Sequence, residues 1–191
     1  MYARSRCLSR FFIAPCYTLY KKKYSLPNRE WNKGETISTE QEQWTAQLRE
    51  VTITFRSALF LSDDRAIRHR PAPGEWSAVE VVGHMIDKMQ MWASRMQRIL
   101  VEELPALPGY DQDALVRDHD YAHADPEVLL EQLKQARERF ATLVERIPIS
   151  AIQREGVHEE FGTMTLRQCI EAPLESAPQH LEQLRAAQAL R

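Results

Sequence analysis

Residues 76–103 read WSAVEVVGHMIDKMQMWASRMQRILVEE, and no other stretch indicates the fold as clearly. Large apolar side chains recur there at every third or fourth position: Val82, Met85, Met89, Trp92, Met96 and Ile99. This spacing places them on one face of an α-helix. Ser77 and Glu80 precede the stripe at the spacing of a capping box, in which each side chain bonds the other residue's backbone N–H. We therefore expect an amphipathic helix from about residue 78 to 103.

Three further segments show the same periodicity. One spans about residues 39–61. Another begins at Asp125-Pro126, where the aspartate can cap the helix and proline fits its first turn, and it ends before Pro148. The last begins after Thr165 and Gln168, a second capping-box pair.

Four amphipathic helices bury their apolar faces best against one another, so the sequence predicts an all-α protein, an antiparallel four-helix bundle. The chain has only six glycines and no recurring runs at strand spacing, which favours helix over sheet. The link at residues 104–124, between the second and third helices, is longer than a helical hairpin needs. It predicts a crossover along the bundle and an up-down-down-up order.

Charge divides the chain into two parts. Residues 1–34 carry eight Lys/Arg and one acid, whereas residues 35–191 carry seventeen Lys/Arg and twenty-six acids. We expect residues 1–35 to be a basic extension and residues 36–191 to be the bundle domain. The extension has three interpretations: a disordered addition, a targeting segment, or an arm that binds a membrane surface or an anionic partner. The acidic body excludes nucleic acid as a partner, since phosphate binding needs a basic face.

The cysteines and the apolar segments of the body indicate the cellular setting in which we expect the protein. Cys169 is the one cysteine of the body, so no disulfide framework exists and a reducing, cytoplasmic setting is the default. Its place in a helical apolar pattern predicts a buried filler. No segment of the body is apolar enough to span a membrane, so we expect no membrane partner for the body.

Two histidines are candidates for chemistry. His84 lies on the flank of the second helix, and His180 lies beside the apolar stripe of the fourth. Imidazoles that project between neighbouring helices are a common way to build a metal site in a bundle. No phosphate-binding glycine loop and no nucleophile elbow occurs, and no catalytic residue can be assigned from spacing alone.

Several short motifs, taken in order, resemble the DinB/YfiT-like family over about residues 40–188. They are Trp76-Ser77 with residues 80–87, Gly156-Val157-His158 with Phe161-Gly162, residues 165–168, and residues 180–184. The resemblance implies a four-helix bundle of the order given above. It also implies one divalent transition metal (Zn, Ni or Fe). Where activities in the family are known, they include thiol-cofactor-dependent transfer and isomerisation.

The family's metal site takes one histidine from helix two and a His-x-x-x-His pair from helix four. His84 matches the first ligand and His180 the last, but the middle position is Ser176. A neutral hydroxyl is a poor ligand for Zn²⁺ or Ni²⁺, so the resemblance implies weakened metal binding. Pro173 and Pro178 also predict a kinked or split helix.

Three residues around the missing ligand have alternative interpretations. Ser176 could cap a restarted helix, with Pro178 in its first turn and Gln179 closing the box. Asp87, one turn from His84, could be a replacement ligand but is expected to be a solvated carboxylate. His158 could approach the site as another replacement.

Two functional classes remain open. The first is a DinB-like enzyme with an impaired or altered metal site at His84 and His180, acting as a thiol-dependent transferase or hydrolase on a small-molecule or thiol substrate. The alternative is a non-catalytic bundle, a binding or homodimerising module that has lost the metal site. Ser176 and the two prolines favour the second class, and the two retained histidines favour the first.

Overall fold

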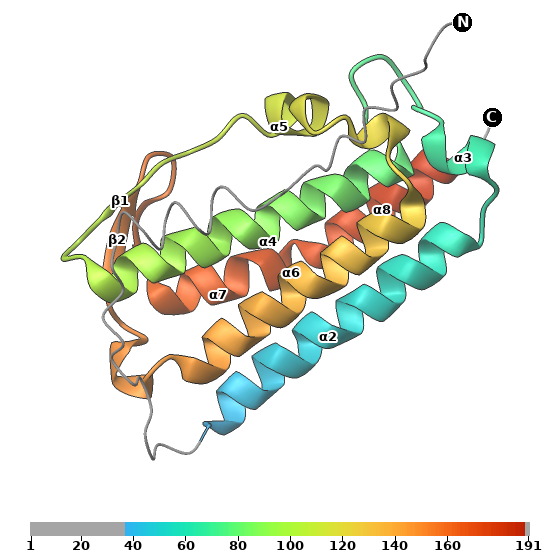
Figure 1. Ribbon diagram of the computed structural model, residues 1–191. Coiled ribbons are helices and arrows are strands. Elements are labelled where there is room, and N and C mark those ends of the chain that lie inside the picture. The colour runs from blue at the N-terminus through green and yellow to red at the C-terminus, as the bar shows by residue number, and fades with distance from the viewer. Residues whose placement is uncertain (1–36, 190–191) are drawn as a thin grey trace, which may run out of the picture. The chain divides into compact units, whose positions relative to one another are not determined.

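The computed structural model describes residues 37–189, in which four long helical segments form a bundle (Figure 1). These segments are α2 (Thr39–Phe60), α4 (Ala78–Val101), α6 (Pro126–Arg146) and a split fourth helix, α7 (Leu166–Glu175) with α8 (Ala177–Gln188). The basic extension expected at residues 1–35 lies outside the described residues.

The order of the helices is up-down-down-up. α2 runs in one direction, α4 and α6 both run in the opposite direction, and α7 and α8 return parallel to α2 (Figure 1). α6 packs between α2 and α4, while α7 and α8 pack against α4. The expectation of an all-α, antiparallel four-helix bundle is therefore confirmed.

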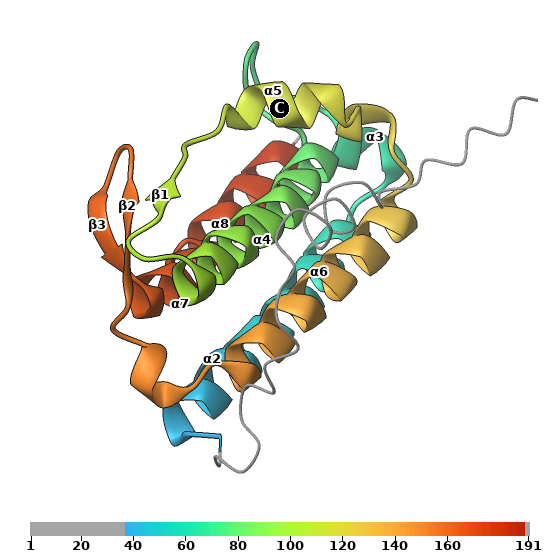
Figure 2. The same cartoon turned by 60° about the vertical axis from the view of Figure 1, so that its left-hand side comes forward.

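The connections hold smaller elements. The first contains α3 (Asp64–Arg68), and the crossover between α4 and α6 contains β1 (Ala106–Leu107), α5 (Gln112–Asp118) and the 3₁₀ turn η1 (Tyr121–His123). The link from α6 to α7 contains η2 (Ile149–Ala151), β2 (Glu155–His158) and β3 (Gly162–Thr165). Figure 2 shows α5 lying over α4, with the strands at one end of the bundle.

The three strands form a small sheet that the sequence did not predict. β1 pairs in parallel with β2, and β2 pairs antiparallel with β3, which gives the order β1-β2-β3. Gly162 begins β3 with a φ of +70°, a conformation that glycine adopts without strain. At Gly156 a Cβ would lie 2.9 Å from Leu107 Cδ1, so a larger residue would require the Leu107 side chain to shift where β1 meets β2.

Helix starts follow the predicted capping pattern. Ser77 N–H donates to Glu80 Oε2 at 2.9 Å, and the Thr165–Gln168 box is also formed. Asp125 caps α6 by accepting from the backbone N–H of residues 127 and 128. These side-chain bonds satisfy N–H groups that the first turn of a helix leaves unpaired.

The fourth helix is split at Ser176 with Pro178 in the first turn of α8, as predicted, but the predicted capping box is absent. Ser176 has helical dihedral angles (φ −84°, ψ −11°) instead of the extended ones of a capping residue. Its hydroxyl therefore reaches back and donates to Ala172 O at 3.0 Å. The prediction that Gln179 closes a box around Ser176 is wrong for this reason.

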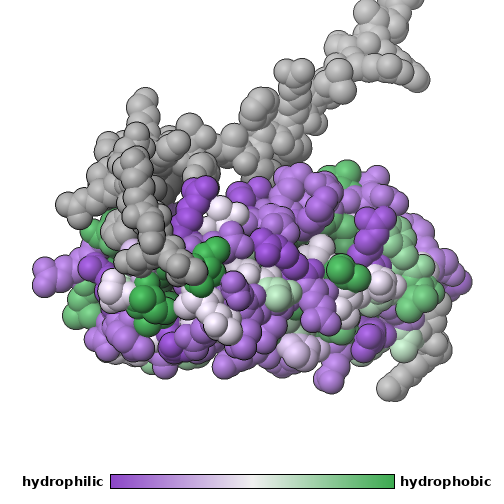
Figure 3. All heavy atoms as spheres, turned by 90° about the horizontal axis from the view of Figure 1, so that it is seen from below, coloured by the Kyte–Doolittle hydropathy of each residue, from purple (hydrophilic) through white to green (hydrophobic). Residues whose placement is uncertain are grey.

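The predicted apolar stripes meet inside the bundle. Met85, Met89 and Met96 of α4 are almost completely buried, as is Phe140 of α6. Cys169 is fully buried, and burial raises the pKa of its thiol to about 12, which confirms its role as an apolar filler. The face seen in Figure 3 is mostly hydrophilic, with scattered hydrophobic residues. Within residues 37–189, no helix is both long enough and apolar enough to cross a membrane.

Candidate functional site

The two histidines predicted to bind a metal lie side by side. α4 packs against α8, and the rings of His84 and His180 stack with their centroids 5.0 Å apart and their planes at 23°. His84 is 1% exposed, whereas His180 is half-buried. The helix pairing thus brings together residues that are far apart in the sequence.

Within the described residues 37–189, His84 has no hydrogen-bond partner on either ring nitrogen, although both nitrogens are buried. Buried polar atoms are almost always paired, so this imidazole is an exception that needs an explanation. Burial, with smaller effects from His180 and Lys88, lowers the pKa of His84 to about 3. The ring is therefore neutral at pH 7, which is the form of histidine that binds a metal.

His180 is oriented by its own helix. Its Nδ1 lies 2.6 Å from Ser176 O, and because a carbonyl only accepts, Nδ1 carries the proton. This leaves the lone pair of Nε2 free to accept a hydrogen bond or bind a cation. Burial is the main cause that lowers the pKa of His180, and Lys88 lowers it further.

The position of the expected third ligand supplies no available donor. The Ser176 hydroxyl is directed at Ala172 O and Pro173 O, 3.0 and 3.4 Å away. Among residues 37–189, no three His, Cys, Asp or Glu side chains are grouped so that they could hold one metal ion. The residues present therefore do not fit a centre of three protein ligands.

Lys88 adds a positive charge to the same region. It lies one turn after His84 on α4, is half-buried, and is close enough to lower the pKa of both His84 and His180. Burial lowers the pKa of the Lys88 ammonium to about 8. A protonated amine beside the imidazoles opposes a bound cation, since like charges repel.

Trp76, in the link just before α4, packs on His84 and is held by the crossover. The ring of Trp76 contacts the imidazole with centroids 4.6 Å apart, and Trp76 Nε1 donates to Asp113 Oδ1 of α5 at 2.9 Å. His84 is therefore held between an indole and the ring of His180.

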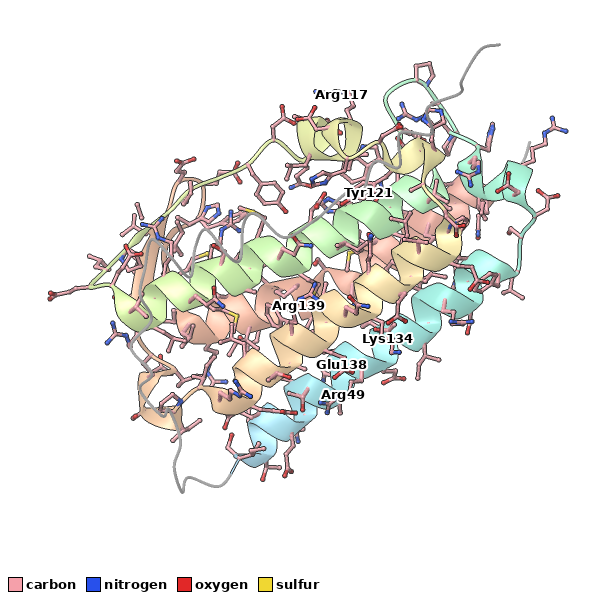
Figure 4. The ribbon with its side chains drawn as sticks, viewed as in Figure 1. Arg49, Arg117, Tyr121, Lys134, Glu138 and Arg139 are labelled. Carbon is pink, nitrogen blue, oxygen red and sulfur yellow. The ribbon has the colours of Figure 1, made fainter. Side chains whose placement is uncertain are left out.

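Asp87 is not the solvated carboxylate that the sequence suggested. It is 4% exposed because η1 covers it: Tyr121 OH donates to Asp87 Oδ1 at 2.9 Å, and His119 Nδ1 lies 3.1 Å from the same oxygen. Tyr121 packs on Gly83, where a Cβ would lie 2.2 Å from its ring, and Figure 4 shows it over α4. Asp87 thus fastens the crossover to α4.

His158, the other suggested replacement ligand, lies in β2 among aromatic rings. Its ring stacks on Phe161 at 4.6 Å and on Trp92 at 6.3 Å. Its Nδ1 accepts from the backbone N–H of Glu160 at 3.1 Å. The structure does not group His158 with the two stacked histidines.

The sequence interpretation overlooked Lys88 and Arg95. The signal for Lys88 was its spacing of four from His84, which places both on one helix face. The signal for Arg95 was a charge between Trp92 and Met96 on an otherwise apolar stripe, and Arg95 is 4% exposed.

The fold and site can now be compared with known proteins. The family model described as the DinB superfamily matches residues 37–184. The chain is 28% identical over 137 residues to a Bacillus subtilis (strain 168) protein named "Putative metal-dependent hydrolase YfiT", covering 71% of this chain and 77% of that one. A Bacillus licheniformis protein also named a "Putative metal-dependent hydrolase" is 23% identical over 153 residues, or 80% of this chain and 87% of that one.

A solved structure has the same architecture. It is described as "YfiT from Bacillus subtilis is a probable metal-dependent hydrolase with an unusual four-helix bundle topology". It superposes with a TM-score of 0.71 at 24% identity, over 84% of this chain and 93% of that one. The family match spans most of the chain, including α4 and α8, which carry the stacked histidines. The chain belongs to the DinB superfamily.

Proposed function

We propose that this protein is a DinB-superfamily protein whose divalent-metal site is impaired, with His84 and His180 remaining and no third ligand. The observation that carries the proposal is the pair of unpartnered, buried nitrogens on His84. Burying an imidazole with neither nitrogen hydrogen-bonded lowers stability, and a ligand bound at those nitrogens would offset this cost. A retained imidazole therefore supports a present or former role in binding.

The hydrolase description of the relatives fits a metal that activates water, and the family resemblance adds thiol-dependent transfer as a related chemistry. Ser176 and Lys88 weaken that chemistry here, because the hydroxyl donates to Ala172 O and the ammonium repels a cation. The proposed activity is thus hydrolysis or thiol transfer on a small molecule, reduced by the loss of one ligand.

The metal content of purified protein tests this proposal. Mass spectrometry of the elements should find less than one equivalent of Zn, Ni or Fe in the native chain and about one equivalent in Ser176→His, since the substitution restores an imidazole one turn before His180. Ser57→His on the exposed face of α2 is the matched control for a histidine added to a helix. His84→Ala in the Ser176→His background should remove the gained metal.

Two results would overturn the proposal. A Ser176→His variant that gains no metal would show that the position is not a lost ligand site. A native chain that holds a full equivalent, and loses it in His84→Ala, would show that the site is not impaired.

The second candidate is a bundle without catalysis that binds or dimerises. The observation that favours it is the lack of any group of three metal ligands among residues 37–189. Sedimentation of the full chain, together with a screen of ester and thiol substrates, separates the two candidates. A dimer with no turnover in either native protein or metal-loaded Ser176→His supports the module.

A further inference from the structure

A cavity of about 110 Å³ lies between the end of α4, the crossover and the β2–β3 hairpin. Figure 2 shows these three elements meeting at the strand end of the bundle. Its polar lining includes Lys88, Arg95, Tyr110 and His158, and its apolar lining includes Trp92 and Phe161. Donors from three separate parts of the chain therefore converge on one space, which has room for a small molecule.

Arg95 is the most unusual of these donors. It is 4% exposed, and its Nε is buried with no hydrogen-bond partner in the structure. One terminal nitrogen donates to Pro108 O at 2.8 Å, and the guanidinium stacks on Trp92 at 4.5 Å and on Tyr110 at 5.6 Å. No carboxylate forms an ion pair with it within residues 37–189. Glu159 and Glu160 act on it electrostatically but form no ion pair with it. A buried guanidinium without an ion pair is unfavourable, and its planar fork suits a carboxylate.

His158 supplies a second unused donor. It is 3% exposed, and its Nδ1 accepts from the backbone N–H of Glu160 at 3.1 Å and of Phe161 at 3.4 Å. The proton of the neutral ring must therefore be on Nε2. That Nε2 is buried and has no acceptor. The stacking on Trp92 and Phe161 holds the ring in place.

The charge of the lining is positive although the domain is acidic. Lys88 and Arg95 contribute two cations, and Glu160, which is exposed, contributes one carboxylate. The nearby Glu159 carboxylate accepts from Gly109 N–H at 2.9 Å and is also exposed. The unpaired groups are donors, so the missing partner is an acceptor with negative charge.

We propose that this cavity binds the carboxylate of a small organic acid. Arg95 Nε–H and His158 Nε2–H donate to its oxygens, Lys88 neutralises its charge, and the rings of Trp92 and Phe161 hold the apolar part of the molecule. The site is separate from the pair His84 and His180, so its occupancy does not depend on a metal. Lys88, which lines the cavity, is also close enough to His84 and His180 to act on them electrostatically.

Calorimetric titration of the full chain, in buffer with a chelator, tests this assignment. The probes are acetate, pyruvate and benzoate, with benzamide as a neutral match for benzoate and inorganic phosphate as a second anion. At least one carboxylate should bind with a Kd below about 10 mM, and benzamide and phosphate should bind more weakly or not at all. Arg95→Gln and Lys88→Gln should each raise the Kd about tenfold or more. Arg117→Gln, an exposed arginine that points away from the bundle (Figure 4), should leave it unchanged.

Nuclear magnetic resonance adds a local readout, since the His158 Nε2–H proton should shift on addition of the carboxylate. If Arg95→Gln loses its helical circular dichroism and is therefore unfolded, the Kd of Lys88→Gln tests the proposal instead. The Lys88 side chain is half-exposed, so its replacement should leave the fold intact. The proposal is overturned if none of the carboxylates binds, if benzamide equals benzoate, if phosphate binds tightest, or if the folded variants bind like the native chain. None of these results bears on the metal content, which tests the proposed function separately.

Discussion

Glu80 and His84 lie one turn apart on α4, and each is 1% exposed, yet their surroundings are opposite. Glu80 accepts from the Ser77 N–H at 2.9 Å and from the Ser77 hydroxyl at 2.8 Å, and it pairs with Arg70. Among residues 37–189, neither ring nitrogen of His84 has a hydrogen-bond partner. Equal burial therefore has two meanings: a satisfied polar group contributes to stability, whereas an unsatisfied one lowers stability and marks a place for a ligand.

The largest expected effect on stability comes from changing Glu80, the buried residue whose hydrogen bonds are satisfied. Glu80→Ala should lower the free energy of unfolding by about 3 kcal/mol, because it removes the capping box and leaves buried donors unpaired. Urea denaturation measures this loss. Glu138→Ala is the control: its exposed pair with Arg49, 3.5 Å apart, should contribute at most about 0.5 kcal/mol (Figure 4). If Glu80→Ala and Glu138→Ala lost similar amounts of stability, the buried carboxylate would contribute no more than an exposed ion pair, and the expectation would be wrong.

A second change tests the packing between the two residues. Gly83→Ala places a Cβ 2.2 Å from the Tyr121 ring, so the ring must move. We expect a loss of about 2 kcal/mol from overpacking, after allowing for the roughly 1 kcal/mol by which alanine favours a helix. In a Tyr121→Ala background the same substitution should be neutral or stabilising. A loss of equal size in both backgrounds would mean that the ring is not the cause.

His84 and Glu80 should affect the pH dependence of unfolding in different pH ranges. The pKa of His84 is lowered to about 3, so below pH 6.5 the unfolded chain binds a proton that the folded chain does not. Above pH 6.5 the titration of His84 leaves the free energy of unfolding unchanged. Below pH 6.5 the free energy of unfolding falls by up to about 1.4 kcal/mol per pH unit, until the pH reaches about 3. The lowered pKa values of His180 and His158 act in the same direction. Glu80, whose pKa is also lowered, keeps its full contribution to stability above about pH 4.5 and loses it only as the pH falls below that value.

Unfolding measured from pH 6.5 to 5 with a chelator present checks this expectation. His84→Leu should have a clearly shallower slope than the native chain over that window, and Glu80→Gln should keep the native slope. An unchanged slope in His84→Leu would contradict the assignment to His84.

The smallest expected effect is a gain. His84→Leu at pH 7.5 should raise the free energy of unfolding by about 1 kcal/mol, because an apolar side chain replaces an imidazole that lacks hydrogen bonds. Thermal unfolding measures it. A loss comparable to that of Glu80→Ala would show that His84 is a structural residue, and the contrast between the two positions would fail.

The helices could be predicted because their signals are local. Ser77 with Glu80 and Thr165 with Gln168 act over three residues, and the apolar stripes repeat within each helix. The sheet could not be predicted, since β1 has only two residues and two residues show no alternation. Its pairing with β2 depends on how the crossover lies over the bundle.

The candidate site was predictable only in part. The resemblance identified His84 and His180, and the structure stacks them. Burial of Asp87 depends on Tyr121, which lies 34 positions later and reaches α4 only through the crossover. The direction of the Ser176 hydroxyl depends on the backbone dihedral angles of that residue. The two nearby prolines indicate a break in the helix but do not fix those angles.

The short pairing of β1 with β2 has a kinetic consequence. Its partners Ala106 and Val157 lie about 50 positions apart, and Val157 N–H donates to Pro105 O at 2.8 Å. A pairing between such distant segments, held by few hydrogen bonds, forms more slowly and opens more easily than a helix, whose contacts are local. This edge should therefore form last and open first, while α4 remains folded. Amide hydrogen exchange at Val157 would then report how often the carboxylate cavity opens to solvent.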